Sequence, residues 1–485
     1  MQQIKQQSIS NFILFLIGFA ILLYITSRAI IIDITHDEAY SFYNVKHFWY
    51  VEALCTGNTH WFNFLAIKLA VLFGFEKVGQ LRWFSIFSAS VFFIMVYFWI
   101  RSISNIYIKI AAFSSIVLNP YLIDYFSLAR GYSSGLMFEA LSLVCFCSYI
   151  YHHKQKFQRL SLLFAGMSAL ANFNFFYFFV AFCILYFYQI YFKNGFNFFK
   201  NKMFYFELLF VIGITVLVLK ALLFITLCSN DIAMYGEYDF VTSIFYGMID
   251  TFICQDFMIN NEIKKTLCYI LFGLVLLGSI NGILTLKKHK NWWYYLASYI
   301  ILIMFILLII NKLCFNVLYP NYRTTLMFYP LISLVCIGFI NSLFTNTKIK
   351  VLLSLSFSIV VILNLVMCVN FNKTIDYYQQ QDSKACFNFL DKIKAKKVGV
   401  DGNLFGVYRN YYQQTEQNKF LFIGEIINTH VPLRLNFNAN KISEYDYLVL
   451  FPPYNMSFYK NRIKKLLCEK YYFHSGTLVV KVVKL

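Results

Sequence analysis

The sequence predicts a polytopic α-helical membrane protein with about eleven transmembrane helices and a C-terminal extracytoplasmic α/β domain. The first observation is composition: of 485 residues, 59% are hydrophobic, 20% are aromatic and only 13% are charged. Soluble domains carry about 25% charged residues, so a water-soluble enzyme, a disordered chain and a disulfide scaffold are excluded. The other two observations are long apolar runs and an uneven division of charge between the loops.

A helix that crosses a bilayer needs about 20 mostly apolar residues. The eleven candidate segments are 11–32, 83–100, 106–123, 131–151, 159–172, 175–192, 203–227, 266–286, 292–311, 324–342 and 350–370. The stretch from His60 to Phe75 is also apolar, but it is short and contains Asn63 and Lys68. We therefore expect it to lie in the membrane interface, within one long external loop over residues 33–82.

The loop charges predict the orientation. One set of loops contains no acidic residue, and its basic residues are Lys5, Arg101, Lys109, Lys154, Lys156, Arg159, Lys193, Lys200, Lys202, Lys287, Lys288, Lys290, Lys348 and Lys350. Basic loops face the cytoplasm, so the N-terminus is expected inside. These basic residues contribute to the net charge of +19 and lie in short loops between apolar runs, so we expect no nucleic-acid partner.

The composition changes after the last apolar segment, which divides the chain into a transmembrane domain (1–371) and an extracytoplasmic α/β domain (372–485). In the second domain we expect helices over 383–395 and 461–470, strands over 397–401 and 445–451, and a hairpin around Ser475-Gly476. The 12 cysteines show no CxxC spacing. Those in or at the ends of apolar spans, Cys368 among them, are expected to act as small hydrophobic residues, and no disulfide framework is predicted.

The first candidate site follows the first apolar segment. It reads Thr35-His36-Asp37-Glu38-Ala39-Tyr40, with two adjacent carboxylates beside a histidine. Such a group at a membrane surface suits proton abstraction or binding of a divalent metal. The alternative is a solvated acidic start of a loop.

Two arginine motifs form the second candidate site. Arg130-Gly131-Tyr132 opens the segment 131–151, and Tyr322-Arg323 opens the segment 324–342. An arginine at a helix N-terminus lies at the wrong end for the helix dipole, but it can receive a phosphate together with the free N–H groups. The alternative for both motifs is an interfacial anchor.

Three ionisable residues lie in or near spans. Charges inside spans are costly and usually face a partner or a cavity. Lys220 and Glu139 are expected either to pair with each other or to serve a site, and Arg28 is expected to reach the headgroups.

Taken together, these residues resemble the GT-C superfamily of membrane glycosyltransferases, in particular the bacterial branch similar to protein O-mannosyltransferases and lipid A aminoarabinose transferases. The resemblance is carried by Asp37-Glu38, Asn58-Thr59-His60, Leu72-Phe73-Gly74, Glu76, Leu81-Arg82, Asn119-Pro120, Ala129-Arg130-Gly131-Tyr132, Tyr319-Pro320 and Arg323, in that order. Gly131-Tyr132 departs from relatives that carry an Asp after the Arg, and Trp61 replaces the Pro that often follows the His.

The resemblance implies transfer of a sugar from a polyprenyl-phosphate donor to an acceptor hydroxyl at the outer face of the bacterial cytoplasmic membrane. The acceptor would be a lipid, a glycan or a protein. Asp37 would be the base and Glu38 its partner. The substrate-binding residues would be His36, Tyr40, His60, Arg130, Tyr132, Lys220, Tyr322 and Arg323. No cofactor is required, although a divalent metal at His36, Asp37 and Glu38 stays open. The competing class is a transporter or flippase of lipid-linked sugars.

Overall fold

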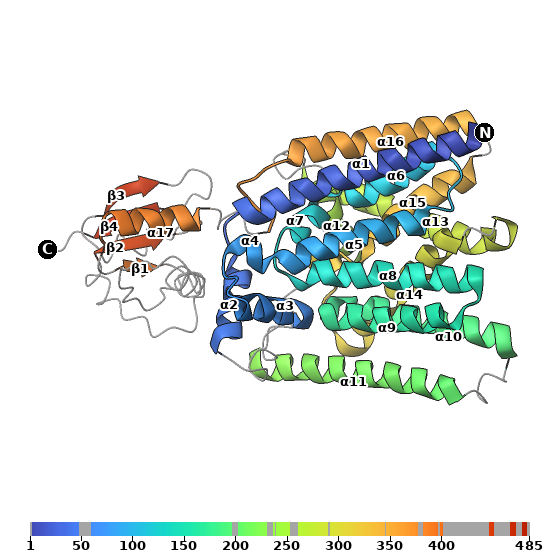
Figure 1. Cartoon of the computed structure of the whole chain (residues 1–485), viewed down its shortest axis with the longest axis horizontal. Coiled ribbons are helices and arrows are strands. Elements are labelled where there is room, and N and C mark those ends of the chain that lie inside the picture. Colours follow the sequence, from blue (N-terminus) through green and yellow to red (C-terminus); the bar gives the residue numbers. More distant parts are fainter. Residues whose placement is uncertain are drawn as a thin grey trace. The chain divides into compact units, whose positions relative to one another are not determined.

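The computed structural model describes residues 2–47, 60–195, 202–229, 236–237, 239–252, 260–289, 292–344, 346–376, 382–395, 398–400, 446–450, 466–471 and 478–482. The chain forms two compact units (Figure 1). The first comprises Met1–Thr26, Tyr50–Leu65 and Trp83–Val369, and the second comprises Ser27–Trp49, Ala66–Arg82 and Asn370–Leu485. The end of the first long helix and two parts of the external loop, up to residue 49 and from residue 66, therefore group with the C-terminal domain.

The first unit is a helical bundle. Its helices are α1 (Gln2–Ile31, whose last turn enters the second unit), α5 (Trp83–Ile100), α6 (Ile106–Val117), α7 (Pro120–Phe126), α8 (Gly131–His152), α9 (Gln155–Ala171), η2 (Phe173–Phe175), α10 (Phe176–Asn194), α11 (Lys202–Ser229), α12 (Phe240–Phe252), α13 (Asn261–His289), α14 (Trp292–Phe315), η5 (Tyr322–Thr325), α15 (Phe328–Leu343) and α16 (Thr347–Cys368).

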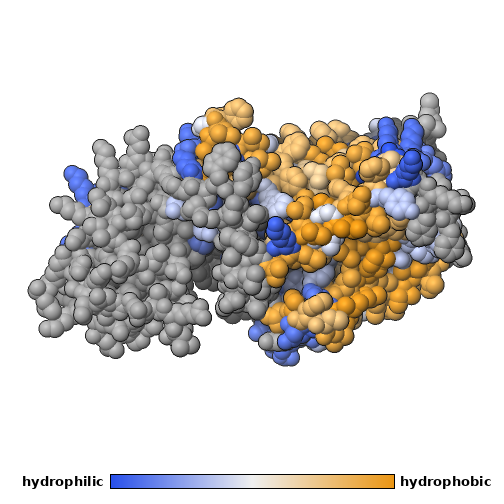
Figure 2. Space-filling view, turned by 90° about the horizontal axis from the view of Figure 1, so that it is seen from below, coloured by the Kyte–Doolittle hydropathy of each residue, from blue (hydrophilic) through white to orange (hydrophobic). Residues whose placement is uncertain are grey.

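The bundle is that of a multi-pass membrane protein. Among the described residues, eight helices are long and apolar enough to cross a membrane, or nine when the bent pair α6–α7 is counted as one span. The bend of 53° falls at Asn119-Pro120. Proline disfavours the helical conformation of the residue before it, and it has no backbone N–H to continue the hydrogen bonds of α6. Apolar side chains cover much of the visible surface of the bundle (Figure 2).

The other two predicted spans form α9 and α15, of 17 and 16 residues. Both helices return along their neighbours. The C-terminal end of α9 lies at the N-terminal end of α8, because a Cβ at Gly131 would be 2.3 Å from the Ala171 carbonyl oxygen. Likewise, a Cβ at Gly338, late in α15, would be 2.3 Å from the ring of Tyr294, early in α14. All eleven predicted segments are helical, but α9 and α15 are each shorter than the 18 residues required of a candidate span.

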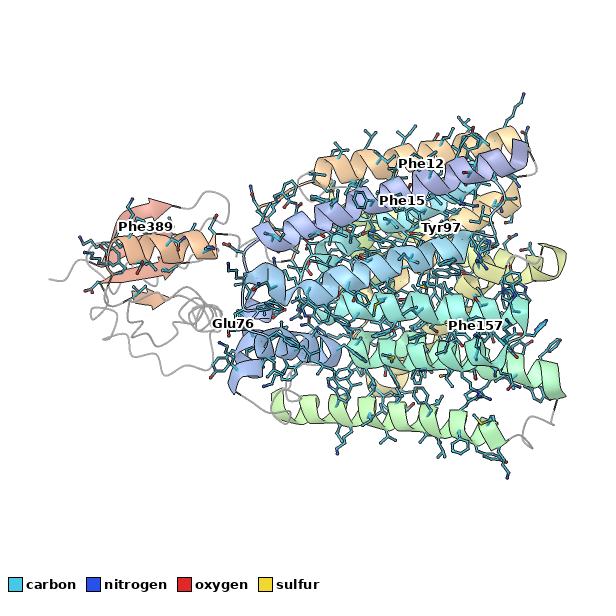
Figure 3. All side chains as sticks on the ribbon, viewed as in Figure 1. Phe12, Phe15, Glu76, Tyr97, Phe157 and Phe389 are labelled. Atoms are coloured by element: carbon cyan, nitrogen blue, oxygen red, sulfur yellow. The ribbon has the colours of Figure 1, made fainter. Side chains whose placement is uncertain are left out.

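Lipid-facing aromatics account for part of the unusual composition. Phe12 and Phe15 project from α1 (Figure 3) and are 61% and 65% exposed. Phe15 also stacks on Phe19, with ring centroids 6.0 Å apart. Exposed rings on a spanning helix contact hydrocarbon and not water, so this surface costs no hydrophobic free energy in a bilayer.

The predicted interfacial helix is α3 (Trp61–Leu72). Its 12 residues rise about 18 Å, well short of the roughly 30 Å of the hydrocarbon core. At its end the chain turns through Gly74 (φ +76°) toward α4 (Val78–Leu81). Glu76 in this turn (labelled in Figure 3) pairs with Lys46 of α2 (His36–His47) at 2.7 Å. The short length of α3 agrees with the prediction that this stretch does not cross the membrane.

The second unit contains α2, α4, part of α3, and the C-terminal domain. The described part of that domain has α17 (Ser383–Lys392) and a sheet of β1 (Val398–Val400), β2 (Tyr447–Leu450), β3 (Leu466–Tyr471) and β4 (Leu478–Val482) in the order β1-β2-β4-β3. β1 and β2 are parallel, and the other neighbours are antiparallel. The predicted α/β class and the pairing of the last two segments are confirmed, while Ser475-Gly476 lies outside the described residues.

One predicted helix of this domain is wrong. Residues 461–470 were expected to be helical, but β3 begins at Leu466. Leu466–Tyr471 pairs with β4 as an edge strand, with a register shift between Cys468 and Lys470. The segment has a helix-like mixture of charged and apolar residues, and pairing with Leu478–Val482 overrides this local preference. Residues 461–465 lie outside the described residues.

The expectation for Arg28 is also wrong. Its side chain is 2% exposed and does not reach outward. Its Nη1 donates to the Asn370 carbonyl oxygen (2.6 Å) and Oδ1 (3.1 Å), and Nη2 donates to the Lys373 carbonyl oxygen (3.2 Å). The end of α1 thus holds the segment that enters the C-terminal domain, because a planar guanidinium can serve several carbonyl acceptors at once.

Cys368 at the end of α16 is disulfide-bonded. The prediction that it acts only as a small hydrophobic residue is therefore wrong. The described cysteines that remain free include Cys145, Cys147 and Cys183, which lie within spans as expected.

Asp33 links the loop after α1 to α17. Its Oδ2 accepts from the Lys384 backbone N–H at 3.0 Å, in the first turn of that helix. Burial raises the pKa of this carboxyl from 3.8 to about 6, and the hydrogen bond from Lys384 only partly opposes the shift. A carboxyl with a raised pKa binds its proton more tightly in the folded state. Asp33 therefore lowers stability as pH rises from about 4 through 6.

We expect Asp33→Asn to raise the stability of the protein at pH 7.5 by up to about 3 kcal/mol, because it removes the buried charge and keeps an acceptor for Lys384. The gain should shrink toward zero as pH falls from about 6 to about 4. Thermal unfolding of both proteins in detergent over this pH range measures the difference. A constant difference would show that Asp33 does not titrate in this window.

Candidate active site

The predicted acidic pair lies in the second unit, in the first turn of α2. Thr35 precedes the helix, and its Oγ1 accepts from the Glu38 backbone N–H at 3.4 Å. In return Glu38 Oε2 accepts from the Thr35 backbone N–H at 2.9 Å and from its hydroxyl at 3.0 Å. This reciprocal arrangement is a capping box, which the Thr-x-x-Glu spacing explains. The acids also lie at the favourable end of the helix dipole.

Glu38 is held by Arg82. The Arg82 Nε and Nη2 donate to the two carboxylate oxygens of Glu38, each at 2.7 Å. The two side chains are 0% and 2% exposed. The remaining Arg82 hydrogen bonds go to backbone carbonyls of the loop after α1, those of Ala29 (3.0 Å), Ile32 (2.8 Å) and Asp33 (3.0 Å). Arg82 therefore fixes the turn from which Asp37 projects.

This geometry gives Glu38 a structural task that the sequence reasoning missed. Both of its oxygens accept from a buried guanidinium, so it is poorly suited to replace Asp37 as a base. A sequence signal for this ion pair does exist. Arg82 is a cation directly before an apolar span, where a buried charge needs an acidic partner.

Replacing Arg82 with Met should destabilise the protein by roughly 3–5 kcal/mol, because the buried Glu38 carboxylate loses its cation. Arg82→Met combined with Glu38→Gln should recover part of the loss. Thermal unfolding in detergent measures both variants, with Arg159→Met as the control, since Arg159 is exposed and its side chain donates to Gln155 of the same helix. Equal stability of the single and double variants would contradict this account.

Asp37 is 4% exposed, and its Oδ1 lies 3.3 Å from Nδ1 of His36. The His36 ring in turn stacks on Tyr40, with centroids 6.5 Å apart. The predicted residues His36, Asp37 and Tyr40 are thus together, and an imidazole beside the carboxylate can exchange a proton with it.

The sequence left open whether His36, Asp37 and Glu38 bind a divalent metal. Among the described residues, no three His, Cys, Asp or Glu side chains are placed to hold a metal ion. Glu38, which the sequence offered as a ligand, directs its oxygens to Arg82 and Thr35.

Arg130 lies in the first unit, directly before α8. Its side chain is 1% exposed. An interfacial anchor would reach the surface of the bundle, so burial argues against that alternative for Arg130. The preceding helix α7 is capped by Asn119, whose Oδ1 accepts from the backbone N–H groups of Tyr121 (2.9 Å) and Leu122 (3.1 Å). Asn119-Pro120 thus separates α6 from α7, and α7 leads to Arg130 at the start of α8.

Three helix ends meet at Gly131. A Cβ at this position would lie 2.3 Å from the Ala171 carbonyl oxygen and 2.5 Å from the His60 Cβ. Close packing of α8, α9 and the start of α3 therefore requires glycine, which explains why no Asp follows Arg130. The His60 ring lies 5.4 Å from that of Tyr132, and Asn63 Nδ2 donates to the Ala129 carbonyl oxygen at 2.6 Å. The structure brings His60 and Tyr132 together beside Arg130, while Asn58 and Thr59 lie outside the described residues.

A chain of tyrosine rings connects this point to α15. The ring of Tyr132 lies 4.7 Å from Tyr125, Tyr125 lies 5.4 Å from Tyr121, and Tyr121 lies 6.0 Å from Tyr329 near the start of α15. The starts of α8 and α15 therefore lie at the same end of the bundle. This connection joins segments about 200 residues apart, and no local sequence signal predicts it.

The second arginine motif lies just before α15, in the 3-10 helix η5. Arg323 is partly exposed, so for this residue burial does not decide between a ligand contact and an anchor. Tyr322 has φ +44°, a left-handed conformation that non-glycine residues seldom adopt. Its ring lies 6.3 Å from that of Tyr246 in α12.

Lys220 and Glu139 do not pair. Lys220 is exposed on α11 and has no ion-pair partner among the described acidic residues. Glu139 is 1% exposed in α8, and within the described part of the chain neither of its carboxylate oxygens has a hydrogen-bond partner. The structure therefore assigns Lys220 to the outer surface of the bundle, which leaves its predicted role in substrate binding without geometric support.

Comparison with known proteins identifies the fold. No protein-family model and no curated protein sequence matches the chain. Among solved structures, it is similar to ArnT from Cupriavidus metallidurans in the apo state, with a TM-score of 0.57, 8% identity, and coverage of 97% of this chain and 98% of that one. The same protein bound to undecaprenyl phosphate matches with a TM-score of 0.56 and 7% identity over the same shares.

The likeness extends over nearly the whole length of both chains, so it includes the helical bundle and the C-terminal domain together. At this identity it concerns the fold alone. The chain is a multi-pass membrane protein that shares its fold with the ArnT structures, which agrees with the fold that the resemblance of its sequence implied.

Proposed function

We propose that the protein transfers a sugar from a polyprenyl-phosphate donor to an acceptor hydroxyl. The observation that carries the proposal is the pair of arginine motifs at one end of the bundle, joined by the rings of Tyr132, Tyr125, Tyr121 and Tyr329. A GT-C type fold and a solved ArnT structure bound to undecaprenyl phosphate support the same chemistry.

The donor phosphate is the leaving group of the proposed reaction. It stays anionic before and after the sugar departs, so it needs cations more than a general acid. Arg130 and Arg323 fit this task, because a planar guanidinium binds two phosphate oxygens at once. We propose that both arginines contact the phosphate in one cavity, with Tyr132 and Tyr322 as hydrogen-bond donors.

Asp37 is the proposed general base. The acceptor oxygen attacks the anomeric carbon, the bond from that carbon to the phosphate oxygen breaks, and the acceptor proton moves to the Asp37 carboxylate. His36 at 3.3 Å can then pass this proton on. Glu38 contributes by holding the turn through Arg82. The acceptor is a hydroxyl of a lipid, a glycan or a protein, and Tyr40, whose ring stacks on that of His36, is proposed to contact it.

Purified protein incubated with a panel of labelled polyprenyl-phosphate sugars tests the proposal. Release of free polyprenyl phosphate together with a labelled acceptor supports a transferase. The competing function is a transporter or flippase of lipid-linked sugars. In that case the donor would cross a reconstituted vesicle membrane intact, and no polyprenyl phosphate would be released.

We further propose that the chain lies in the bacterial cytoplasmic membrane with its N-terminus inside and residues 372–485 outside. Two observations support this: the acid-free basic loops, and the disulfide at Cys368 beside the C-terminal domain, since disulfides persist in oxidising compartments. Reporter fusions after Lys290 and after Leu485 should report opposite sides of the membrane. Signals from the same side would contradict the orientation.

A further inference from the structure

The segment around α12 encloses the chain that carries Arg323. Before the helix, Glu237 and Tyr319 exchange two backbone hydrogen bonds, of 3.1 and 3.0 Å. The approach is close, because a Cβ at Gly236 would lie 2.6 Å from the Tyr319 carbonyl oxygen, and Gly236 has φ +149°. The ring of Phe240, the first residue of α12, lies 5.2 Å from that of Tyr319. One side of the Tyr319–Arg323 stretch is therefore fixed by backbone and ring contacts.

Within α12, Gly247 packs directly on Tyr322. A Cβ at Gly247 would lie 2.9 Å from the Tyr322 Cα and 3.3 Å from its backbone nitrogen. Only glycine allows this approach. Tyr322 is also the residue with φ +44°, and such a conformation persists only where the surroundings determine it. The backbone of Tyr322, directly before Arg323, therefore packs against α12 at a glycine, where the helix has no side chain.

α12 is in turn fastened to α13. Asp250 forms an ion pair with Lys264, and Tyr246 donates to Asn261 Oδ1 at 3.1 Å. The Lys264 Nζ also lies 5.6 Å from the centre of the Tyr246 ring. Asp250 is 9% exposed, so the pair is largely removed from water and is screened less by salt than a surface pair. These contacts prevent α12 from moving away from Tyr322.

We propose that α12 is a clamp that aims the Arg323 guanidinium at the donor phosphate, with Gly247 and the Asp250–Lys264 ion pair as its positioning residues. None of the three needs to touch the ligand. They act by holding Tyr322 in a conformation that it would otherwise leave, and the direction of the next side chain depends on that conformation. The inference rests on the proposed function of Arg323 as a phosphate contact.

The test measures binding of undecaprenyl phosphate to the purified full-length protein in detergent. Arg323→Ala should weaken binding by about tenfold or more, the scale of one lost charge-assisted contact. Gly247→Ala should weaken it by roughly three- to tenfold through a misdirected Arg323. Gly213→Ala and Gly273→Ala are matched controls, because a Cβ at either helical position meets nothing within 4 Å, and both should bind as the wild type does.

A double-mutant cycle separates positioning from general damage. If Gly247 acts through Arg323, Gly247→Ala should cause no further loss in the Arg323→Ala background. The double substitution Asp250→Asn with Lys264→Gln should behave in the same way, and it carries the test if Gly247→Ala does not fold.

Each other outcome overturns the proposal. Wild-type binding by Gly247→Ala and by the ion-pair variant would show that α12 does not position Arg323. If these variants weaken binding equally in the wild-type and Arg323→Ala backgrounds, they act on a site other than Arg323. Undiminished binding by Arg323→Ala would remove the proposed phosphate contact and the clamp with it, whereas a loss confined to Arg323→Ala would remove only the clamp.

Discussion

Asp37→Asn is expected to lower the rate of sugar transfer by at least about 10²-fold, the usual scale for loss of a general base. The substitution preserves the size of the side chain, and it removes the oxygen that would accept the acceptor proton. Because Asp37 is proposed to act on the acceptor and not on the phosphate, binding of undecaprenyl phosphate should stay near the wild-type value. Turnover of a labelled donor and lipid binding, measured on the same preparation, separate these two effects.

Glu76→Gln is a suitable control for this experiment. Glu76 belongs to the same compact unit and also has a basic partner, Lys46, but its side chain is 30% exposed. An exposed ion pair contributes little, so this variant should transfer sugar at nearly the wild-type rate. Near-normal turnover by Asp37→Asn would reassign the base. His36 would then be the next candidate, because Glu38 is occupied by Arg82.

Arg130→Lys is expected to weaken both donor binding and turnover, although the positive charge is kept. Lysine is a point charge and cannot bind two phosphate oxygens in the fixed geometry of a guanidinium. Arg130→Ala should cost more, by about tenfold or more in affinity, because the phosphate charge is present before and after the sugar leaves. Titration with undecaprenyl phosphate and steady-state turnover measure the two effects.

Arg130 is buried, so its loss can also disturb packing around Gly131. Thermal unfolding of each variant therefore accompanies the binding measurement. Arg101→Lys is the matched control, since Arg101 is exposed in a predicted cytoplasmic loop beside Phe98. Silent behaviour of Arg130→Lys in binding and turnover would contradict the phosphate contact.

The sequence predicts the proximity of His36 and Asp37 but not the role of Glu38. Asp37 and His36 are neighbours in the chain, so their proximity follows from local structure, and the Thr-x-x-Glu capping box starts the helix that presents them. The role of Glu38 could not be predicted locally, because its partner Arg82 lies 44 residues away. Their adjacent positions predict that Asp37 and Glu38 act as a pair, but in the tertiary structure Glu38 is bound to Arg82 and has a different role.

For the arginine motifs, too, the sequence predicts the local structure and not the tertiary contacts. That Arg130 and Arg323 each precede a helix was visible in the apolar runs that follow them. That their helices start at the same end of the bundle, linked through Tyr121 and Tyr329, depends on the packing of α7 against α15. The closeness of Gly247 to Tyr322 is of the same kind, since glycine in an apolar helix carries no signal about what it touches.

The sequence by itself determined the membrane class, the helical segments and the change to an α/β domain near residue 370. These properties depend on the length and polarity of continuous segments, and a bilayer acts on each segment separately. Only the tertiary structure decided that Arg28 holds Asn370 across 342 residues, that Leu466–Tyr471 is a strand, and that Glu38 belongs to Arg82. Each of these depends on which distant group supplies a hydrogen-bond partner, because a buried polar group must find one wherever the chain brings it.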